Sequence, residues 1–356
     1  MNFSKVIFLS LCILLFQFCT NKNEVEVEQN IHKIEISKEF LLDDENGFQI
    51  EALDTIDLER PGNPPLTFIQ DIAFSKDYIF LVDNKKGLLK FDYEGNFIQT
   101  IGKKGEGPDE YNVVTTIYVD EKRNRILLAV WDKMVVNSYD MEGNFIASSK
   151  KLAGQPISFY KEDSTILVIQ ESLDSKEKDG KSISISSMEP TTLEFKTQEN
   201  PLYSFTSKFN RFYNFLNVFG KVNQEHLFYM PRVLFAGLVD QKDTIYRMKE
   251  DHLVPGYQLD FTDFGKSDTL RIEFTEINDG HASILLLYKK DSYHLMLDLA
   301  HNTPKFSYKL PFKGVSLEGF PKHLNADTYY RIIRNEDAQE EENPKIVMSS
   351  LTKGTN

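Results

Sequence analysis

The chain contains the segment Phe91-Asp92-Tyr93-Glu94-Gly95-Asn96-Phe97-Ile98, and 48 residues later it contains Tyr139-Asp140-Met141-Glu142-Gly143-Asn144-Phe145-Ile146. Each copy consists of the end of a predicted strand, a Glu-Gly-Asn turn, and a second strand that begins with Phe-Ile. Glycine and asparagine tolerate the positive φ angles of a tight hairpin turn, and the flanking apolar residues favour strands. Because the repeated unit consists of strands and recurs after about 50 residues, the two segments predict a β-propeller.

The units around these turns each contain four short predicted strands, which is the composition of a propeller blade. In the first unit they lie at Ile69–Phe74, Tyr78–Asp83, Leu88–Phe91 and Phe97–Ile101, and in the second at Val113–Asp120, Arg125–Trp131, Met134–Tyr139 and Phe145–Lys150. We expect four more diverged units near Ile157–Lys196, Phe215–Leu259, Leu270–Lys309 and Val315–Leu351. The predicted fold is therefore all-β, a six-bladed β-propeller with four-stranded antiparallel blades.

A propeller has to join its last blade to its first, because an unpaired edge strand promotes aggregation. Strand-like alternation precedes the first unit at Ile31–Ile36 and again at Ile50–Leu58. We expect one of these two segments to pair with the predicted strand at Lys345–Ser350 and so complete the last blade.

The composition is that of a folded globular protein with an acidic surface. Hydrophobic residues make up 41% of the chain and charged residues 27%, and the net charge is −13. A strongly acidic chain repels phosphate backbones, and no local cluster of lysine and arginine offsets this charge. The sequence therefore argues against nucleic acid as a partner.

The N-terminal 19 residues have the pattern of an export signal. Lys5 precedes an apolar run from Val6 to Phe18, which is too short to cross a bilayer comfortably and suits a signal peptide. Cys19 ends this run and polar residues follow at once, so residues 1–19 are predicted to be a lipoprotein-type signal peptide with Cys19 as the lipid acceptor. Phe18 is bulky where such signals carry a small residue, and a plain cleaved signal peptide is the alternative.

We expect a tether at residues 20–30, the propeller at residues 31–352 and a tail at residues 353–356.

Several motifs in this order resemble one known family. Leu58-Glu59, Val82-Asp83 and the first repeated turn precede the segment Ile101-Gly102-Lys103-Lys104-Gly105-Glu106-Gly107-Pro108-Asp109-Glu110-Tyr111. With the lipoprotein start, this series resembles the six-bladed β-propeller lipoproteins of Bacteroidetes, relatives of the NHL-type propellers. The resemblance covers essentially the whole mature chain and implies an exported lipoprotein on the outer membrane, facing the periplasm or the cell surface. It implies no reaction, because the family carries no established one.

The loop after the first unit is the strongest candidate for a binding site. Its candidate residues are Gly102, Gly105, Gly107, Pro108, Glu110 and Tyr111. The backbone N–H groups of the glycines could cradle an anion, although the loop lacks the features of a Walker A or dinucleotide-binding motif. The alternative is a crossover between blades, in which glycine and proline set the backbone path and Glu110 and Tyr111 hold it.

Three further residues have two interpretations each. Asp83 and Asp132 end the second predicted strand of their units, where carboxylates from several blades could hold Ca²⁺ in the central channel. Alternatively, each caps its own hairpin through bonds to backbone amides. Trp131 could form an aromatic platform for a sugar or a peptide, or it could pack between blades.

No residue pattern in the chain requires catalysis, and no cofactor is predicted. The favoured function is a binding or interaction module of the cell envelope, with an envelope protein, a small molecule or a glycan as its ligand. The alternative is a metal-dependent enzyme, using Ca²⁺ or Zn²⁺ in the central channel as lactonases or lyases do. A third possibility is a structural spacer without a ligand. Converging carboxylate, amide or histidine side chains at the channel mouth would favour the enzyme.

Overall fold

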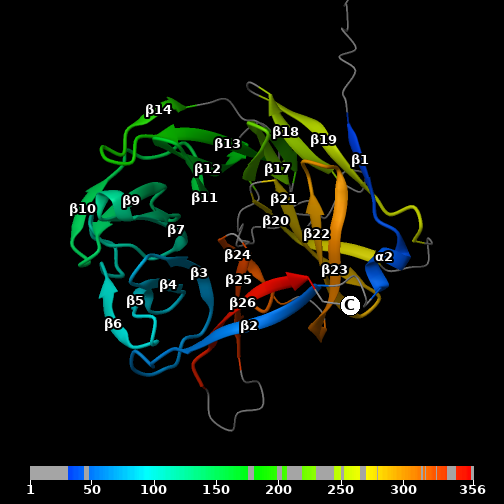
Figure 1. Ribbon diagram of the computed structural model, residues 1–356. Helices are drawn as coiled ribbons and strands as arrows, with labels where there is room; N and C mark the ends of the chain where they lie inside the picture. Colours follow the sequence, from blue (N-terminus) through cyan, green and yellow to red (C-terminus); the bar gives the residue numbers. More distant parts are fainter. Residues whose placement is uncertain are drawn as a thin grey trace, which may run out of the picture. The chain divides into compact units, whose positions relative to one another are not determined.

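The computed structural model describes residues 31–43, 48–174, 180–198, 203–206, 219–229, 244–249, 252–264, 270–278, 280–313, 316, 318–325, 327–334 and 342–353. These residues form six small antiparallel sheets that are arranged as the blades of a propeller (Figure 1). The predicted fold is therefore confirmed. The predicted signal peptide, Cys19 and the predicted tether lie outside the described residues.

Blades 1 to 3 follow one another along the chain. Blade 1 contains β3 (Ile69–Phe74), β4 (Ile79–Asp83), β5 (Gly87–Phe91) and β6 (Phe97–Ile101), and blade 2 contains β7 (Val114–Asp120), β8 (Arg125–Val130), β9 (Val135–Asp140) and β10 (Phe145–Ser148). Blade 3 contains β11 (Gln155–Glu162), β12 (Thr165–Asp174) and β13 (Gly180–Met188), and its outer position is shared by β14 (Phe195–Gln198) and β15 (Tyr203–Thr206). The strands of blades 1 and 2 begin and end within two residues of the predicted positions.

The N-terminal part of the chain adds a strand to blade 4 and a strand to blade 6, and it packs against blade 5. Blade 4 contains β16 (Phe219–Val222), β17 (Glu225–Tyr229), β18 (Thr244–Lys249) and β19 (His252–Asp260), and blade 5 contains β20 (Leu270–Asn278), β21 (His281–Tyr288), β22 (Asp291–Asp298) and β23 (Thr303–Lys313). Blade 6 contains β24 (Lys322–Asn325), β25 (Thr328–Ile333) and β26 (Lys345–Lys353), and the N-terminal β2 (Phe48–Asp57) is its fourth strand. The first strand of each blade is its inner strand; β3 contacts β7, β7 contacts β11, and β16 contacts β20.

The N-terminal segment, residues 31–43 and 48–57, forms a strap along the outer edges of blades 4, 5 and 6 (Figure 1, blue). β1 (His32–Glu35) pairs in parallel with β19, and the alternating residues Ile34 and Ile36 are buried in the core of blades 4 and 5. The short helix α2 (Lys38–Leu42) packs on β23, where the Leu41 carbonyl accepts a hydrogen bond from Ser307 Oγ. Within the described residues, no helix is long and apolar enough to span a bilayer.

β2 closes the ring. It pairs antiparallel with β26 over its whole length, from Phe48 opposite Lys353 to Asp57 opposite Lys345. Of the two segments that we expected to complete the last blade, the one at Ile50–Leu58 is confirmed. The segment at Ile31–Ile36 instead adds a fifth strand to blade 4.

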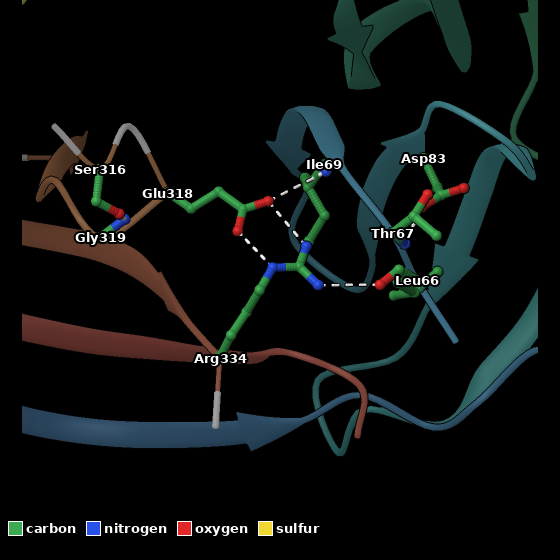
Figure 2. A network of polar contacts seen from close by, with 8 residues as sticks. All are labelled: Leu66, Thr67, Ile69, Asp83, Ser316, Glu318, Gly319 and Arg334. Atoms are coloured by element: carbon green, nitrogen blue, oxygen red, sulfur yellow. Dashed lines mark hydrogen bonds and ion pairs between the residues drawn. The ribbon is translucent and has the colours of Figure 1, made fainter. Parts of the chain in front are cut away.

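A polar network reinforces the joint between blade 6 and blade 1 (Figure 2). Arg334 pairs with both carboxylate oxygens of Glu318, at 2.6 and 2.8 Å, and donates a further hydrogen bond to the carbonyl of Leu66 at 2.9 Å. Glu318 also accepts a hydrogen bond from the amide of Ile69, the first residue of β3. Because Glu318 and Arg334 flank strands of blade 6 while Leu66 and Ile69 belong to blade 1, this partly buried ion pair fixes one blade against the other.

The repeated turns have the same internal bonding. Asp92 accepts hydrogen bonds from the backbone and side-chain nitrogens of Asn96, both at 2.8 Å, and Asp140 does the same with Asn144 at 2.7 and 2.8 Å. These bonds explain why aspartate and asparagine recur at a fixed spacing, since each pair closes its own turn. They also hold the pKa values of both aspartates below their usual range, although partial burial opposes this at Asp140.

The two turn glycines are equivalent in the repeat but differ in their surroundings. Gly95 and Gly143 have φ angles of +88° and +92°, so alanine at either position is strained by about 1 kcal/mol. A Cβ atom at Gly95 would lie 2.1 Å from the carbonyl oxygen of Asp57 in β2, whereas the nearest atom to one at Gly143 is Ile101 Cδ1 at 3.4 Å. Only the first turn therefore presses against the strand that closes the ring.

We expect Gly95→Ala to lower the free energy of unfolding by about 2 kcal/mol or more, and Gly143→Ala by about 1 kcal/mol. The difference arises because a side chain at position 95 has to displace the end of β2. Urea unfolding of the two variants and the wild type measures both values. Equal losses would contradict the close approach of the first turn to β2.

Candidate functional site

The predicted loop between blades 1 and 2 uses its polar groups internally. The amide of Gly105 donates to the carbonyl of Tyr111 at 3.1 Å, and the amide of Gly107 donates to Glu110 Oε2 at 2.9 Å. The amide of Gly102 donates a long hydrogen bond, of 3.4 Å, to the carbonyl of Gly143 in the next blade. An anion in this loop would have to displace these partners, so the geometry favours the crossover interpretation.

The remaining loop residues hold the crossover in place. Tyr111 is fully buried; its hydroxyl donates to the carbonyl of Ile101 at 2.6 Å and accepts from the amide of Leu88 at 2.9 Å. Pro108 occupies the second position of a turn that is closed by a bond from the Glu110 amide to the Gly107 carbonyl. The hydrogen bond and ion pair with Lys103, at 2.8 Å, and the Gly107 amide hold the pKa of Glu110 below its usual range.

Asp83 and Asp132 contact backbone amides near the hairpins that they end. Asp83 is buried and accepts hydrogen bonds from the amides of Thr67, Lys85 and Lys86 at 2.7 to 2.9 Å. Asp132 accepts one from the amide of Val113 at 3.1 Å. Over the part of the chain that the structure describes, no group of three or more histidine, cysteine, aspartate or glutamate residues is placed to hold a metal ion.

Trp131 lies in the turn between β8 and β9. Its amide donates to the carbonyl of Val113 at 2.8 Å, and its own carbonyl accepts from the amide of Met134 at 3.2 Å. Its backbone therefore closes the turn and ties it to the start of the inner strand β7. Trp131 is not among the residues that line the cavity described below.

Three buried charges that sequence reasoning missed lie on the inner strands. Asp71 of β3, Glu276 of β20 and Lys322 of β24 expose 7%, 1% and 6% of their surfaces. Asp71 accepts hydrogen bonds from the Ile117 amide and the Thr116 hydroxyl of blade 2, and Glu276 accepts one from the His323 amide of blade 6. Charged residues within apolar strands, such as Asp71 beside Ile69 and Ile72, are the signal that could have revealed them.

The ammonium group of Lys322 lies within the electrostatic reach of both carboxylates. Burial raises the pKa of Asp71 and lowers the pKa of Lys322, while each charge favours the ionised form of the other. A lysine thus supplies positive charge among the converging carboxylates of blades 1 and 5. The arrangement links the inner strands of blades 1, 2, 5 and 6 through side chains.

A second buried network resembles a nucleophile and its base. Ser283 Oγ lies 2.5 Å from His294 Nε2, and His294 Nδ1 lies 2.7 Å from the hydroxyl of Tyr308. His294 is completely buried among aromatic rings, including those of Phe306 and Phe320, and burial lowers its pKa to about 3. A substrate has no access to this serine, so the network stabilises the core of blade 5.

The neutral state of His294 makes a testable contribution to the pH dependence of stability. In the unfolded chain a histidine binds a proton below about pH 6.5, whereas His294 in the folded protein stays neutral down to its lowered pKa. Acid therefore favours the unfolded state. From this group alone, the free energy of unfolding should fall by about 1.4 kcal/mol per pH unit between pH 6 and pH 4.

We expect the variant His294→Gln, which has no titratable group at this position, to show a shallower decline over the same pH range, whatever its stability at neutral pH. Urea unfolding at several pH values gives both slopes. Parallel curves for the two proteins would show that His294 binds its proton equally well in the folded state.

The structure also has a cavity that no sequence motif indicated. It has a volume of about 590 Å³ and lies where inner strands of blades 1, 2, 3 and 6 end, at the mouth of the central channel. Its lining consists of Phe74, Ser75, Lys76, Tyr93, Tyr118, Val119, Asp120, Glu121, Lys122, Lys161, Leu324 and Asn325. The loop 102–111 and Asp132 instead lie at the start of β7, which is the opposite end of the inner strand.

The cavity wall combines aromatic rings with charged groups. The hydroxyl of Tyr93 donates to the carbonyl of Ser75 at 2.7 Å, which fixes the ring beside the cavity. Tyr118 has a protonated hydroxyl at neutral pH, as any tyrosine does, which can donate a hydrogen bond; burial raises its pKa further, to about 12. Aromatic faces with a few convergent polar groups are typical of small-molecule sites.

Comparisons with known proteins agree with the propeller fold. A family model described as "Domain of unknown function (DUF4934)" matches residues 32–348. A Bacteroides fragilis protein described as exported has a similar crystal structure, with a TM-score of 0.59, 16% identity, and coverage of 91% of this chain and 100% of that one. A member of the DUF4221 family from Bacteroides vulgatus has a TM-score of 0.52 and 14% identity, with coverage of 86% and 98%. No curated protein matches the chain in sequence.

Proposed function

The chain belongs to the DUF4934 family, and from this premise we propose that it is an exported propeller that binds a small ligand at the mouth of its central channel. The cavity is the observation that carries the proposal. Its volume of about 590 Å³ lies within the range of small-molecule sites, and its wall is built by four blades of a closed ring. Such a wall keeps its shape because each inner strand is paired within its own blade.

Two structural features support binding in preference to the alternative of a metal-dependent lactonase or lyase. The serine and histidine with nucleophile-like geometry, Ser283 and His294, are sealed in the core. The converging carboxylates of Asp71 and Glu276 already have the ammonium group of Lys322 near them. Neither group is presented to a substrate in the cavity.

Export and anchoring belong to the same proposal. The similar Bacteroides fragilis protein is described as exported, and the first residues of this chain have the pattern of a lipoprotein signal that ends at Cys19. A multiply acylated cysteine would hold the propeller stably on the outer membrane, on its periplasmic or outer side. An envelope protein that delivers or receives the ligand is a partner consistent with this location.

Blocking the cavity tests ligand binding. We expect the full-length protein, purified in mild detergent from its own membranes, to retain a small molecule that native mass spectrometry detects. Asn325→Trp should abolish retention, because Asn325 lines the cavity and an indole ring would fill part of it. Thr100→Trp is the matched control, since Thr100 is exposed on the outer strand β6. A molecule that stays bound in Asn325→Trp, or a wild-type protein that retains nothing, would contradict the proposal.

Replacing the acceptor cysteine tests the anchor. We expect Cys19→Ala to move the protein from the membrane fraction to the soluble fraction, because no acyl chain can then be attached at position 19. Fractionation followed by immunoblotting measures the shift. Unchanged membrane partition of this variant would show that the protein is held by other means.

A further inference from the structure

Three lysines from three different blades surround the cavity. Lys76 follows β3 of blade 1, Lys122 follows β7 of blade 2, and Lys161 lies near the end of β11 in blade 3. All three are exposed, and within the described part of the chain their ammonium groups form no ion pair or hydrogen bond. The cavity is therefore a place where positive charge gathers on a protein whose net charge is −13.

The acidic residues of the wall are already engaged. Asp120 forms an ion pair with Arg123 at 2.7 Å, which balances its charge. Glu121 accepts a hydrogen bond from the backbone amide of Lys76, so its carboxylate is directed at the protein. With three lysines, one aspartate and one glutamate, the cavity lining carries one net positive charge, and two when Arg123, the partner of Asp120, is counted with it.

The neutral part of the wall is suited to a ring. Phe74, Tyr93 and Tyr118 contribute aromatic rings, and Asn325 contributes an amide. Aromatic side chains bind flat apolar faces through their large, rigid surfaces. A ligand with acidic groups around a ring would match the rings and the lysines together.

An extended peptide fits the same wall less well. Peptides are usually bound through main-chain hydrogen bonds to an open strand edge or a groove. At this cavity the amide of Ser75 donates to the carbonyl of Tyr78, and the Ser75 carbonyl accepts from Tyr93. The amide of Lys76 is used by Glu121.

We propose that the cavity selects a small organic anion that carries at least two acidic groups on one or more rings, such as an aromatic polycarboxylate or an acidic saccharide. This inference rests on the proposed function, because it names the chemistry of the ligand that the cavity binds. The lysines recognise the acidic groups, and the tyrosines and Phe74 recognise the ring face. The three lysines offset the long-range repulsion of the acidic protein at this position, so binding weakens as salt screens them.

The test is a calorimetric titration of the full-length protein with matched probes. Trimesate, a benzene ring with three carboxylates, and trigalacturonate, an acidic saccharide, represent the two sources of this chemistry. The triamide of trimesate and galactotriose are their uncharged counterparts, and triglutamate represents a peptide. We expect the charged ring probes to bind, with an affinity that falls as the salt concentration rises.

The lysine variants show whether binding depends on the cavity. The combined Lys76→Gln, Lys122→Gln and Lys161→Gln variant should bind the charged ring probes about tenfold more weakly, since each exposed pair contributes modestly. The combined Lys150→Gln, Lys151→Gln and Lys196→Gln variant has the same net charge but leaves the cavity intact, and it should bind like the wild type.

The outcomes separate this inference from the proposed function. Uncharged counterparts that bind as tightly as the charged probes would overturn the selection of anions and leave ligand binding intact. Triglutamate that binds through the three lysines while the ring probes do not would overturn the ring requirement. If no probe binds, the inference is wrong, and retention of a ligand in the Asn325→Trp experiment decides the proposed function independently.

Discussion

Closure of the ring by β2 and β26 is the constraint on which the rest of the structure depends. The two strands come from opposite ends of the described chain, and their pairing completes blade 6. The cavity is built by blades 1, 2, 3 and 6, so it spans this joint and exists only when blade 6 lies beside blade 1. The ion pair between Arg334 and Glu318, with its bonds to Leu66 and Ile69, fixes the same joint through side chains. Closure therefore shapes the proposed binding site directly.

Local sequence signals predicted the blades well and the cavity not at all. The Asp-Asn turns of the repeat are closed by bonds within five residues, so their strands could be placed from the sequence. The cavity depends on distant residues such as Phe74, Lys161 and Asn325, which share no motif and meet only in the closed ring. Residues at equivalent positions of the two repeated turns also have different surroundings. Tyr93 lines the cavity, whereas its counterpart Met141 is buried in the core between blades 1 and 2.

Two groups of charged residues near the channel differ in their partners. Inside, the buried carboxylates of Asp71 and Glu276 interact with the ammonium group of Lys322, and their hydrogen bonds join inner strands of different blades. At the mouth, the lysines are exposed and have no partners among the described residues. The hydrogen bonds of the buried carboxylates hold the inner strands of neighbouring blades together, whereas exposed charges without a partner are available to a ligand. The difference in partners explains why we assign the first group to the scaffold and the second to binding.

The strap affects the order in which strands pair while the protein is being synthesised. β1 and β2 leave the ribosome before any blade, yet their partners β19 and β26 follow more than 200 residues later. Blades 1 and 2 consist of neighbouring hairpins and can form as they emerge, because short loops close quickly. Blades 4 and 6 have to wait, and until then the strap strands and their partners present open edges to other chains. β1 and β2 thus precede all the described blade strands but are paired only after most of them have formed, and a nascent chain of this protein is most prone to misassociation just before β26 is added.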